Sequence, residues 1–166
     1  MKRTIAVVAA SAAFVALVVW GTTEKKSIPA LPVVQADASR ACSTETVAGN
    51  WAFTDTGTVV GIGPRAAVGI FTLDTEGNLQ NGLATSSLNG SVAGETFSGT
   101  YTVNSNCTGT INVEIFDASS GAEIFAVALN IAFDDRMREL RGLFKSVVTP
   151  NGVSLPTTIA LSGRKQ

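Results

Sequence analysis

The chain has no histidine among its 166 residues, and this limits its chemistry more than any other feature of the sequence. Histidine is the usual general base near neutral pH and the commonest metal ligand. Catalysis by Ser-His-Asp or Cys-His groups and histidine-based zinc sites are therefore excluded. Carboxylate, tyrosine, lysine and thiol chemistry remain, together with simple binding. The sequence favours a protein that is not an enzyme, and it identifies no catalytic residue, cofactor or metal site.

Five aromatic residues are candidates for lining a binding site: Trp51, Phe71, Phe97, Tyr101 and Phe144. Rings on the inner face of a small barrel, with few charges among them, are typical of a pocket for a small apolar or amphipathic molecule. Binding of such a small hydrophobic ligand is the leading functional hypothesis. The alternative is that these rings simply fill the core.

Two further hypotheses belong to other functional classes. An isomerase or cyclase of the same architecture needs an inward carboxylate near Tyr101, with a shifted pKa as its sign. Glu114 or Glu95 would supply that carboxylate only if the strand register differed from the one predicted below. A structural or surface-interaction protein would instead assemble as a homo-oligomer through its outer faces, including the apolar segment 122–133.

Cys42 and Cys107 are the only cysteines in the chain. An even number of cysteines in an exported chain favours a disulfide. Such a bond would close a loop of about 65 residues and contribute roughly 4 kcal/mol of stability. A metal pair is excluded because the chain has no CxxC motif, and a reactive single thiol is the alternative.

The N-terminus has the pattern of an export signal. Met1, Lys2 and Arg3 precede an uncharged, Ala- and Val-rich run over 5–20. This predicts export to the periplasm or the extracellular space, with residues 1–20 either removed as a signal peptide or retained as a membrane anchor. Residues 21–41 are expected to be a flexible linker and 42–166 a β-barrel domain. Membrane contact is expected only through the N-terminal segment, if it is not cleaved.

The charge pattern argues against nucleic acid as a partner, and the glycine pattern does not form a phosphate-binding loop. From residue 39 onward the chain has 8 basic and 11 acidic residues, a net charge of −3, so nucleic acid is not expected as a partner. The glycine-rich stretch 56–64 superficially suggests a phosphate loop. No helix pattern follows it and the P-loop lysine is missing, so we predict a plain loop or lid.

Alternating apolar and polar residues are the main structural signal. Over 96–104, Phe97, Tyr101 and Val103 share one face, and Thr100 and Thr102 share the other. Period two of this kind is typical of a sheet with one buried side. Similar segments, separated by turn residues, predict strands over 50–55, 66–74, 79–88, 96–104, 108–117, 122–133 and 157–163. Segment 122–133 is apolar on both faces, so we expect both faces to be covered.

Segment 134–148 is ambiguous. Asp134 could cap a helix, or residues 134–137 could form a hairpin turn that leads into a strand. Gly142 would destabilise a helix by up to about 1 kcal/mol, so we choose the strand. Sequential hairpins without a long crossover then predict an all-β fold, a closed up-and-down antiparallel barrel of about eight strands. Eight strands leave room for packed side chains or one small ligand.

Two stretches resemble known families. Gly49-Asn50-Trp51 and Arg164 resemble the Gly-x-Trp motif and the closing arginine of lipocalin-type barrels, in which the arginine packs on the tryptophan. The second resemblance is found over residues 66–69, 73–78, 99–104 and 107–110. It is to a group of exported bacterial proteins, mostly uncharacterised, whose barrels are similar to allene oxide cyclase. This second resemblance covers most of residues 42–164. It implies a calycin-type barrel outside the cytoplasm and almost nothing about activity.

Overall fold

The computed structural model describes residues 41–166. The predicted signal peptide or anchor (1–20), and the predicted linker (21–41) apart from its last residue, lie outside the described residues. Within residues 41–166, no helix is long and apolar enough to cross a membrane.

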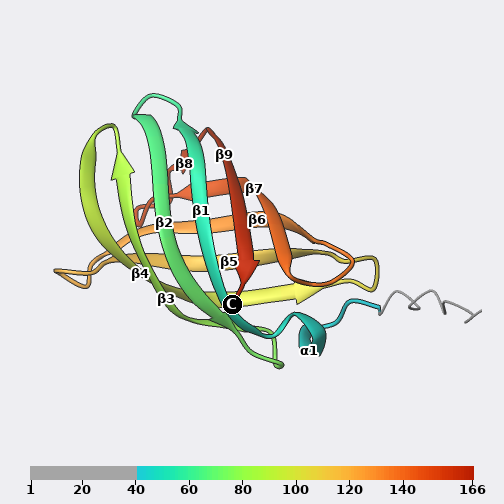
Figure 1. Ribbon diagram of the computed structural model, residues 1–166. Coiled ribbons are helices and arrows are strands. Elements are labelled where there is room, and N and C mark those ends of the chain that lie inside the picture. Colours follow the sequence, from blue (N-terminus) through green and yellow to red (C-terminus); the bar gives the residue numbers. More distant parts are fainter. Residues whose placement is uncertain (1–40) are drawn as a thin grey trace, which may run out of the picture. The chain divides into compact units, whose positions relative to one another are not determined.

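One short helix and nine strands make up the described part of the chain (Figure 1). The helix is α1 (Thr44–Val47). The strands are β1 (Gly49–Val59), β2 (Gly63–Leu73), β3 (Asn78–Leu88), β4 (Ser91–Val103), β5 (Thr108–Asp117), β6 (Glu123–Phe133), β7 (Glu139–Val148), β8 (Ser154–Leu155) and β9 (Thr157–Lys165).

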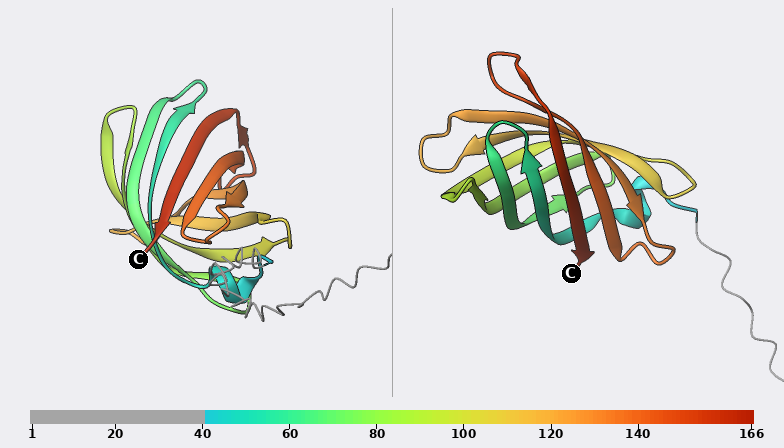
Figure 2. Two further views of the ribbon diagram at one scale, coloured as in Figure 1. Left: turned by 45° about the vertical axis from the view of Figure 1, so that its right-hand side comes forward. Right: turned by 90° about the horizontal axis from the view of Figure 1, so that it is seen from above.

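Eight of the strands close into an antiparallel barrel, as predicted. Each of the first seven strands pairs with the next, and β9 then pairs with both β7 and β1. The two-residue β8 is an extra strand beside the end of β7. Figure 2 shows the strands curling around a common interior. Full closure leaves none of the eight barrel strands with a free edge.

The predicted orientation of the clearest hairpin is confirmed. Tyr101 on β4 is buried and pairs with buried Ile111 on β5, whereas Thr100 and Thr102 are exposed. The inner face therefore collects the apolar row, and the hydroxyl side chains meet solvent.

Segment 134–148 forms a hairpin turn and strand β7, so the helical alternative is wrong. The carboxylate of Asp134 accepts hydrogen bonds from the backbone N–H groups of Arg138 and Glu139 at 2.6 and 2.7 Å. Met137 has φ 53°, a turn conformation that no helix contains. Local carboxylate bonds of this kind stabilise a turn in competition with a helix.

The prediction of a loop over 56–64 is wrong. Residues up to Val59 belong to β1 and residues from Gly63 belong to β2, so only residues 60–62 lie between the strands. A β-carbon on Gly57 would lie 2.0 Å from the carbonyl oxygen of Thr158. Glycine at this position lets the backbone of β9 pass close to β1, and the glycine signal therefore marks close strand approach rather than a loop.

Two inward-facing glycines make space for phenyl rings of the interior. Gly69 pairs with Phe53 across β1 and β2, and Gly82 pairs with Phe97 across β3 and β4. A β-carbon at Gly69 would lie 2.7 Å from the Phe53 ring, and one at Gly82 would lie 2.4 Å from the Phe97 ring. Each ring thus packs over a neighbouring glycine, an arrangement that allows a strand to bend sharply.

Gly69→Ala is expected to lower the free energy of unfolding by about 1–3 kcal/mol, because the added methyl group overpacks the interior. Its β-carbon would lie 2.2 Å from the carbonyl oxygen of Leu83, a backbone atom that cannot move aside. Gly142→Ala is the matched control, since its nearest neighbour would be 3.4 Å away. Urea unfolding followed by circular dichroism measures both, and equal stability of the two variants would contradict the interpretation.

One end of the barrel is closed by α1, an element that the sequence pattern did not reveal. Ser43 caps the helix by accepting a hydrogen bond from the backbone N–H of Thr46, and Val47 is fully buried. The indole N–H of Trp51 donates to the carbonyl oxygen of Val47 at 3.1 Å. Cys42, just before the helix, is disulfide-bonded to Cys107 in the turn after β4. These contacts fix α1 against the barrel.

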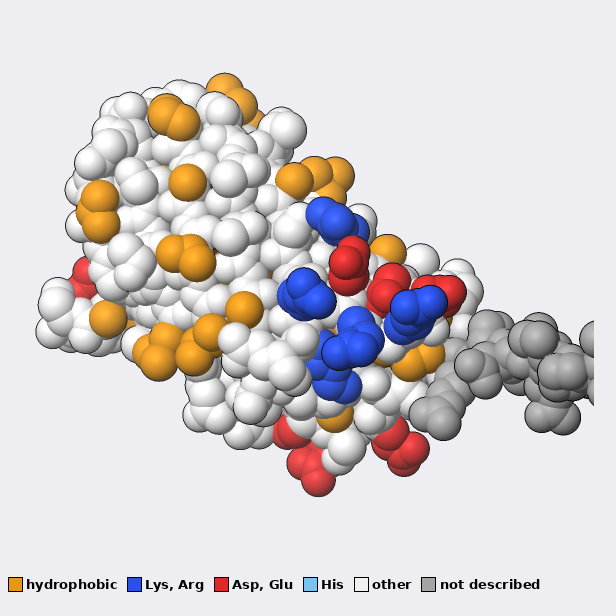
Figure 3. All heavy atoms as spheres, viewed as in Figure 1, with side chains coloured by type: hydrophobic (Ala, Val, Ile, Leu, Met, Phe, Trp, Pro, Cys, Tyr) orange, Lys and Arg blue, Asp and Glu red, His pale blue; other side chains and the backbone are white. Residues whose placement is uncertain are grey.

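The charged side chains and the buried side chains of the outer surface are unevenly distributed. Figure 3 shows that most of the charged side chains on the visible face gather at one end of it, whereas hydrophobic side chains are scattered over the whole face. On the outer face of β6, Ala126 and Ala128 are half-buried, whereas Asn130 and Ala132 are exposed. The expected cover on both faces of this strand is therefore incomplete within residues 41–166.

Candidate functional site

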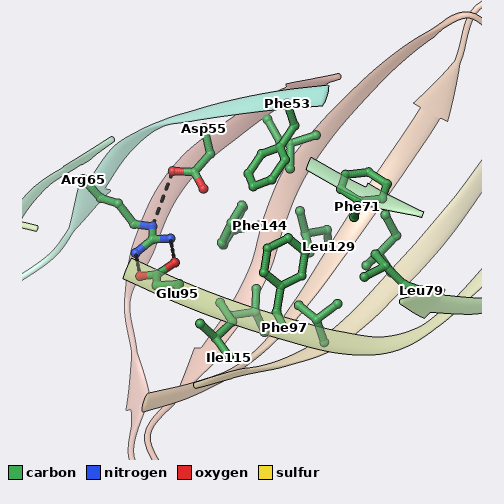
Figure 4. A pocket seen from close by; sticks show the side chains of 14 residues that line it. Phe53, Asp55, Arg65, Phe71, Leu79, Glu95, Phe97, Ile115, Leu129 and Phe144 are labelled. Carbon is green, nitrogen blue, oxygen red and sulfur yellow. Dashed lines mark hydrogen bonds and ion pairs between the residues drawn. The ribbon is translucent and has the colours of Figure 1, made fainter. Parts of the chain in front are cut away.

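A small cavity of about 40 Å³ lies inside the barrel (Figure 4). One water needs roughly 10–15 Å³ of such space, so the cavity has the size of about three waters. Pockets for drug-sized ligands are about tenfold larger. Most of the barrel interior is thus filled by side chains. The residues that line the cavity are Phe53, Asp55, Arg65, Phe71, Leu79, Glu95, Phe97, Ile111, Val113, Ile115, Val127, Leu129, Phe144 and Leu161.

Three of the five predicted aromatic residues line this cavity: Phe71, Phe97 and Phe144. Phe53 joins them, and its ring centroid lies 5.7 Å from those of both Phe71 and Phe97. Tilted and edge-to-face pairs at this separation are the favourable arrangements of aromatic rings. The aromatic part of the site is therefore a packed cluster with a small space beside it.

The structure places Trp51 and Tyr101 at the α1 end, outside the set of cavity-lining residues. The Tyr101 hydroxyl lies within hydrogen-bond distance of the carbonyl oxygens of Thr44 and Asp74. Burial, with a smaller contribution from the charge of Asp74, raises the pKa of Tyr101 to about 12. The phenol is therefore neutral at physiological pH, and its bonds hold α1 and the turn after β2 together.

A cluster of charged side chains borders the aromatic rings inside the barrel. Arg65 donates two hydrogen bonds of 2.9 Å to the two carboxylate oxygens of Glu95, and the Ser86 hydroxyl donates to the same carboxylate at 2.6 Å. The Nε atom of Arg65 lies 3.4 Å from Oδ1 of Asp55. Asp55, Arg65 and Glu95 are 2%, 7% and 5% exposed. Figure 4 shows this cluster beside the phenyl rings.

Small side chains next to the charged cluster leave space for it inside the barrel. Ala67 faces inward on β2 between Asp55 and Ser86, its register partners on β1 and β3. Ala84, the partner of Glu95, is also small and only partly buried. Because neither alanine extends far into the barrel, the long side chain of Arg65 can cross from β2 to Glu95 on β4.

Asp55 is the incompletely paired member of the cluster. Its Oδ1 atom and the Arg65 Nε atom are buried, and neither has a hydrogen-bond partner among the described residues. Their 3.4 Å separation meets the distance of an ion pair without the alignment of a hydrogen bond. A buried polar atom left in this way costs free energy, and such atoms often mark a site for a water, an ion or a ligand.

The two carboxyl groups of the cluster are shifted in opposite directions. Burial raises the pKa of Asp55 above its ordinary value, and the charge of Arg65 opposes this only in part. Burial also acts to raise the pKa of Glu95, but the hydrogen bonds and charge of Arg65 outweigh it and hold that pKa below its ordinary value. Glu95 is thus the stable partner of Arg65, and Asp55 is the carboxyl that takes up a proton more readily.

Asp55→Asn is expected to raise the free energy of unfolding relative to the wild type at pH 7. A carboxyl whose pKa is raised by folding holds its proton longer in the native state, so its contribution to stability falls as pH rises from the unfolded pKa through the folded one. The neutral amide removes that loss. Urea unfolding at pH 7 and pH 3 measures the difference, which should vanish at pH 3. A variant less stable than the wild type at pH 7 would contradict this.

Sequence reasoning missed Asp55 and Arg65 as interior residues and assigned Glu95 the wrong side. The statement that Glu95 faces inward only in a different register is wrong, because Glu95 is two residues from Phe97 and shares its face in the predicted register. Glu114 is exposed on the outer face. The same spacing of two links Asp55 to Phe53. A spacing of two from an inward phenylalanine could therefore have identified Asp55 and Glu95 as interior residues.

The arginine role that the lipocalin resemblance implies is not found here. Arg164 is exposed and pairs with Ala52 and Glu139, whereas Trp51 points inward. Lys165, the partner of Trp51, instead donates from Nζ to the carbonyl oxygen of Thr46 at 3.2 Å. A lysine bound to α1 therefore occupies the position next to the tryptophan.

Comparisons with known proteins give no family for the chain. No family model matches it, and no curated protein matches it. One solved structure, the crystal structure of Rv2717c from M. tuberculosis, is similar over 82% of this chain and 98% of that chain, with 15% sequence identity and a TM-score of 0.34. These results do not connect the chain to lipocalins or to allene oxide cyclase. The barrel is established by its own strand pairing.

Proposed function

We propose that the barrel binds a small amphipathic molecule, with its apolar part against the phenyl rings and its polar group at Asp55. The observation that carries this proposal is the buried Oδ1 atom of Asp55, which lies 3.4 Å from Arg65 Nε but accepts no hydrogen bond from the described residues. It lies on the wall of a cavity whose other lining residues, apart from Arg65 and Glu95, are apolar. Apolar pockets with a few convergent polar groups are typical of small-molecule sites. The proposal is supported by the presence of Phe71, Phe97 and Phe144 among the apolar side chains that line the cavity.

The cavity volume sets the size of the molecule. Space for about three waters accommodates about three non-hydrogen atoms without rearrangement. A longer molecule requires a lining side chain to move, and Phe97 is the half-buried ring among them. Exposure to solvent leaves this ring less constrained than Phe71, which is 3% exposed.

An NMR titration with ethanol tests the proposal on the full chain. Ethanol has three non-hydrogen atoms and gains at most about 4.5 kcal/mol on binding, so saturation is expected only at millimolar concentrations or above. Saturable amide shifts should be confined to strands that line the cavity. Val113→Ile adds one methylene to the cavity wall and should weaken binding. Val68→Ile is the matched control, because Val68 lies on the outer face and is 59% exposed.

Two results would exclude this function. One is an absence of saturable shifts at the cavity-lining strands in the wild-type protein. The other is equal binding by the wild type and the Val113→Ile variant, which would place the ethanol elsewhere. Circular dichroism confirms that both variants fold, so a loss of binding by Val113→Ile alone assigns the site to the cavity.

A second candidate function is an isomerase or cyclase that uses Asp55. The observation that favours it is a buried carboxyl with a raised pKa beside an arginine, an environment in which acid–base groups are found. Chemical conversion of a bound molecule by the wild type and not by Asp55→Asn would favour catalysis over binding. Release of the molecule unchanged by both proteins would exclude catalysis of that molecule.

A further inference from the structure

We propose that the polar group received by Asp55 is an ammonium group, so that the barrel selects small amines over carboxylates. This inference rests on the proposed function and names its ligand class. A buried arginine inside a barrel would at first indicate a site for carboxylates. The contacts of Arg65 point to the opposite preference.

Each nitrogen of the Arg65 guanidinium already faces a carboxylate oxygen. The two terminal nitrogens donate to Glu95 at 2.9 Å, and Nε lies 3.4 Å from Asp55. Bidentate pairs between arginine and a carboxylate are among the strongest hydrogen-bonded contacts in proteins. An incoming anion would have to displace one of these carboxylates, and it would then lie beside the other. Arg65 is therefore unable to serve an anionic ligand.

The charges of the cluster do not cancel. With both carboxylates ionised, Asp55, Arg65 and Glu95 carry one positive and two negative charges, a net charge of −1 in a buried site. The rest of the cavity lining is apolar. Burying an unpaired charge is costly, so a cation that reaches Asp55 removes an existing penalty. An ammonium group also supplies the hydrogen-bond donor that Oδ1 lacks.

The pH dependence of binding follows from the groups that face Asp55. Arg65 on β2 and Glu95 on β4 are the other charged side chains of the cavity lining. The elements opposite contribute Ile115, Val127, Phe144 and Leu161. Because burial favours a proton on Asp55, a bound ammonium takes the place of that proton. Affinity for an amine should therefore rise as pH increases through the Asp55 pKa, while affinity for an alcohol should not.

The test compares ethylammonium chloride, ethanol and sodium acetate at pH 7 and constant ionic strength, by NMR titration of the full chain. Ethylammonium and ethanol have the same number of non-hydrogen atoms and differ in charge. Ethylammonium is expected to bind about tenfold more tightly than ethanol, because a charge-assisted hydrogen bond is roughly twice as strong as a neutral one. Acetate is expected not to bind. Asp55→Asn should abolish the tenfold preference, and Glu114→Gln on the outer face should preserve it.

The outcomes separate this inference from the proposed function. If ethanol binds in the cavity and ethylammonium binds no more tightly, the ammonium preference is wrong and the binding function stands. The same holds if acetate binds as well as ethylammonium, or if the preference survives in Asp55→Asn. If none of the three molecules binds in the cavity, both proposals fail.

Discussion

Replacing Arg65 by methionine is expected to lower the free energy of unfolding by about 3–5 kcal/mol, because it leaves two buried carboxylates without their cation. Glu95 would keep only the hydrogen bond from Ser86, and Asp55 would lose its one positive neighbour. Methionine preserves much of the side-chain volume, so the loss measures charge rather than space. Urea unfolding at pH 7, followed by circular dichroism, gives the value.

Two further variants distinguish this cause from a general loss of packing. Arg141→Met removes a surface arginine that is 70% exposed and lies 3.5 Å from Glu139, and it should cost less than about 1 kcal/mol. Combining Arg65→Met with Glu95→Gln and Asp55→Asn removes the unpaired charges and should recover part of the lost stability. A triple variant no more stable than Arg65→Met alone would show that charge is not the cause.

Loss of the disulfide is expected to cost about 4 kcal/mol, since the bond between Cys42 and Cys107 closes a loop across 65 positions of the chain. Replacement of both cysteines by alanine should therefore lower the urea midpoint strongly without preventing formation of the sheet. The effect should be the same in magnitude when wild-type protein is unfolded in the presence of a reductant. A difference of less than about 1 kcal/mol between oxidised and reduced protein would contradict this expectation.

Loss of the disulfide should also have a local effect at α1. The bond lies at the start of α1, whose carbonyl groups accept hydrogen bonds from Trp51, Tyr101 and Lys165. Without the covalent link, these bonds and the burial of Val47 hold the helix. Hydrogen exchange should therefore increase first at α1 and only later in β1 and β9. Uniform exchange across the barrel in the reduced protein would show that α1 does not depend on the disulfide.

The fold could be predicted from the sequence because its strands alternate strictly. Residues 96–117 have the pattern of a half-buried hairpin, and a shift of one residue would bury Thr100 and Thr102. In contrast, α1 gives almost no periodic signal, because its four residues are too few to show a helical repeat. Its helical form depends on the cap at Ser43 and on packing of Val47 under the barrel.

The charged part of the site was not predicted, because the local sequence does not show which charged residues find partners inside a barrel. Asp55, Arg65 and Glu95 all lie on the inner faces of their strands, which the spacing of two from apolar neighbours did indicate. The spacing does not show which charged side chains form ion pairs with each other. The ion pair between Arg65 and Glu95 joins residues 30 positions apart, and only the closed barrel brings them together. Burial of each charge is stabilised by a partner that the local sequence does not reveal.

The glycine-rich segment shows the same limit. Glycines are enriched in turns, so 56–64 resembled a loop, but Gly57 is required by the close approach of β9. That contact joins residues about 100 positions apart in the chain. A local pattern therefore could not distinguish a turn from a point where two strands come unusually close.

Closure of β1 against β9 has a consequence for how the chain acquires its fold. Trp51 lies beside Lys165, so the beginning and the end of the barrel are neighbours. A nascent chain still lacking β9 cannot complete the ring, so closure of the barrel must wait until β9 has been synthesised. The same proximity permits circular permutation of the barrel, with a linker that joins the end of β9 to the start of α1 and with new ends placed at Asn89 and Gly90. Such a permuted chain would retain every strand pair, but β3 instead of β9 would be the last strand to be synthesised.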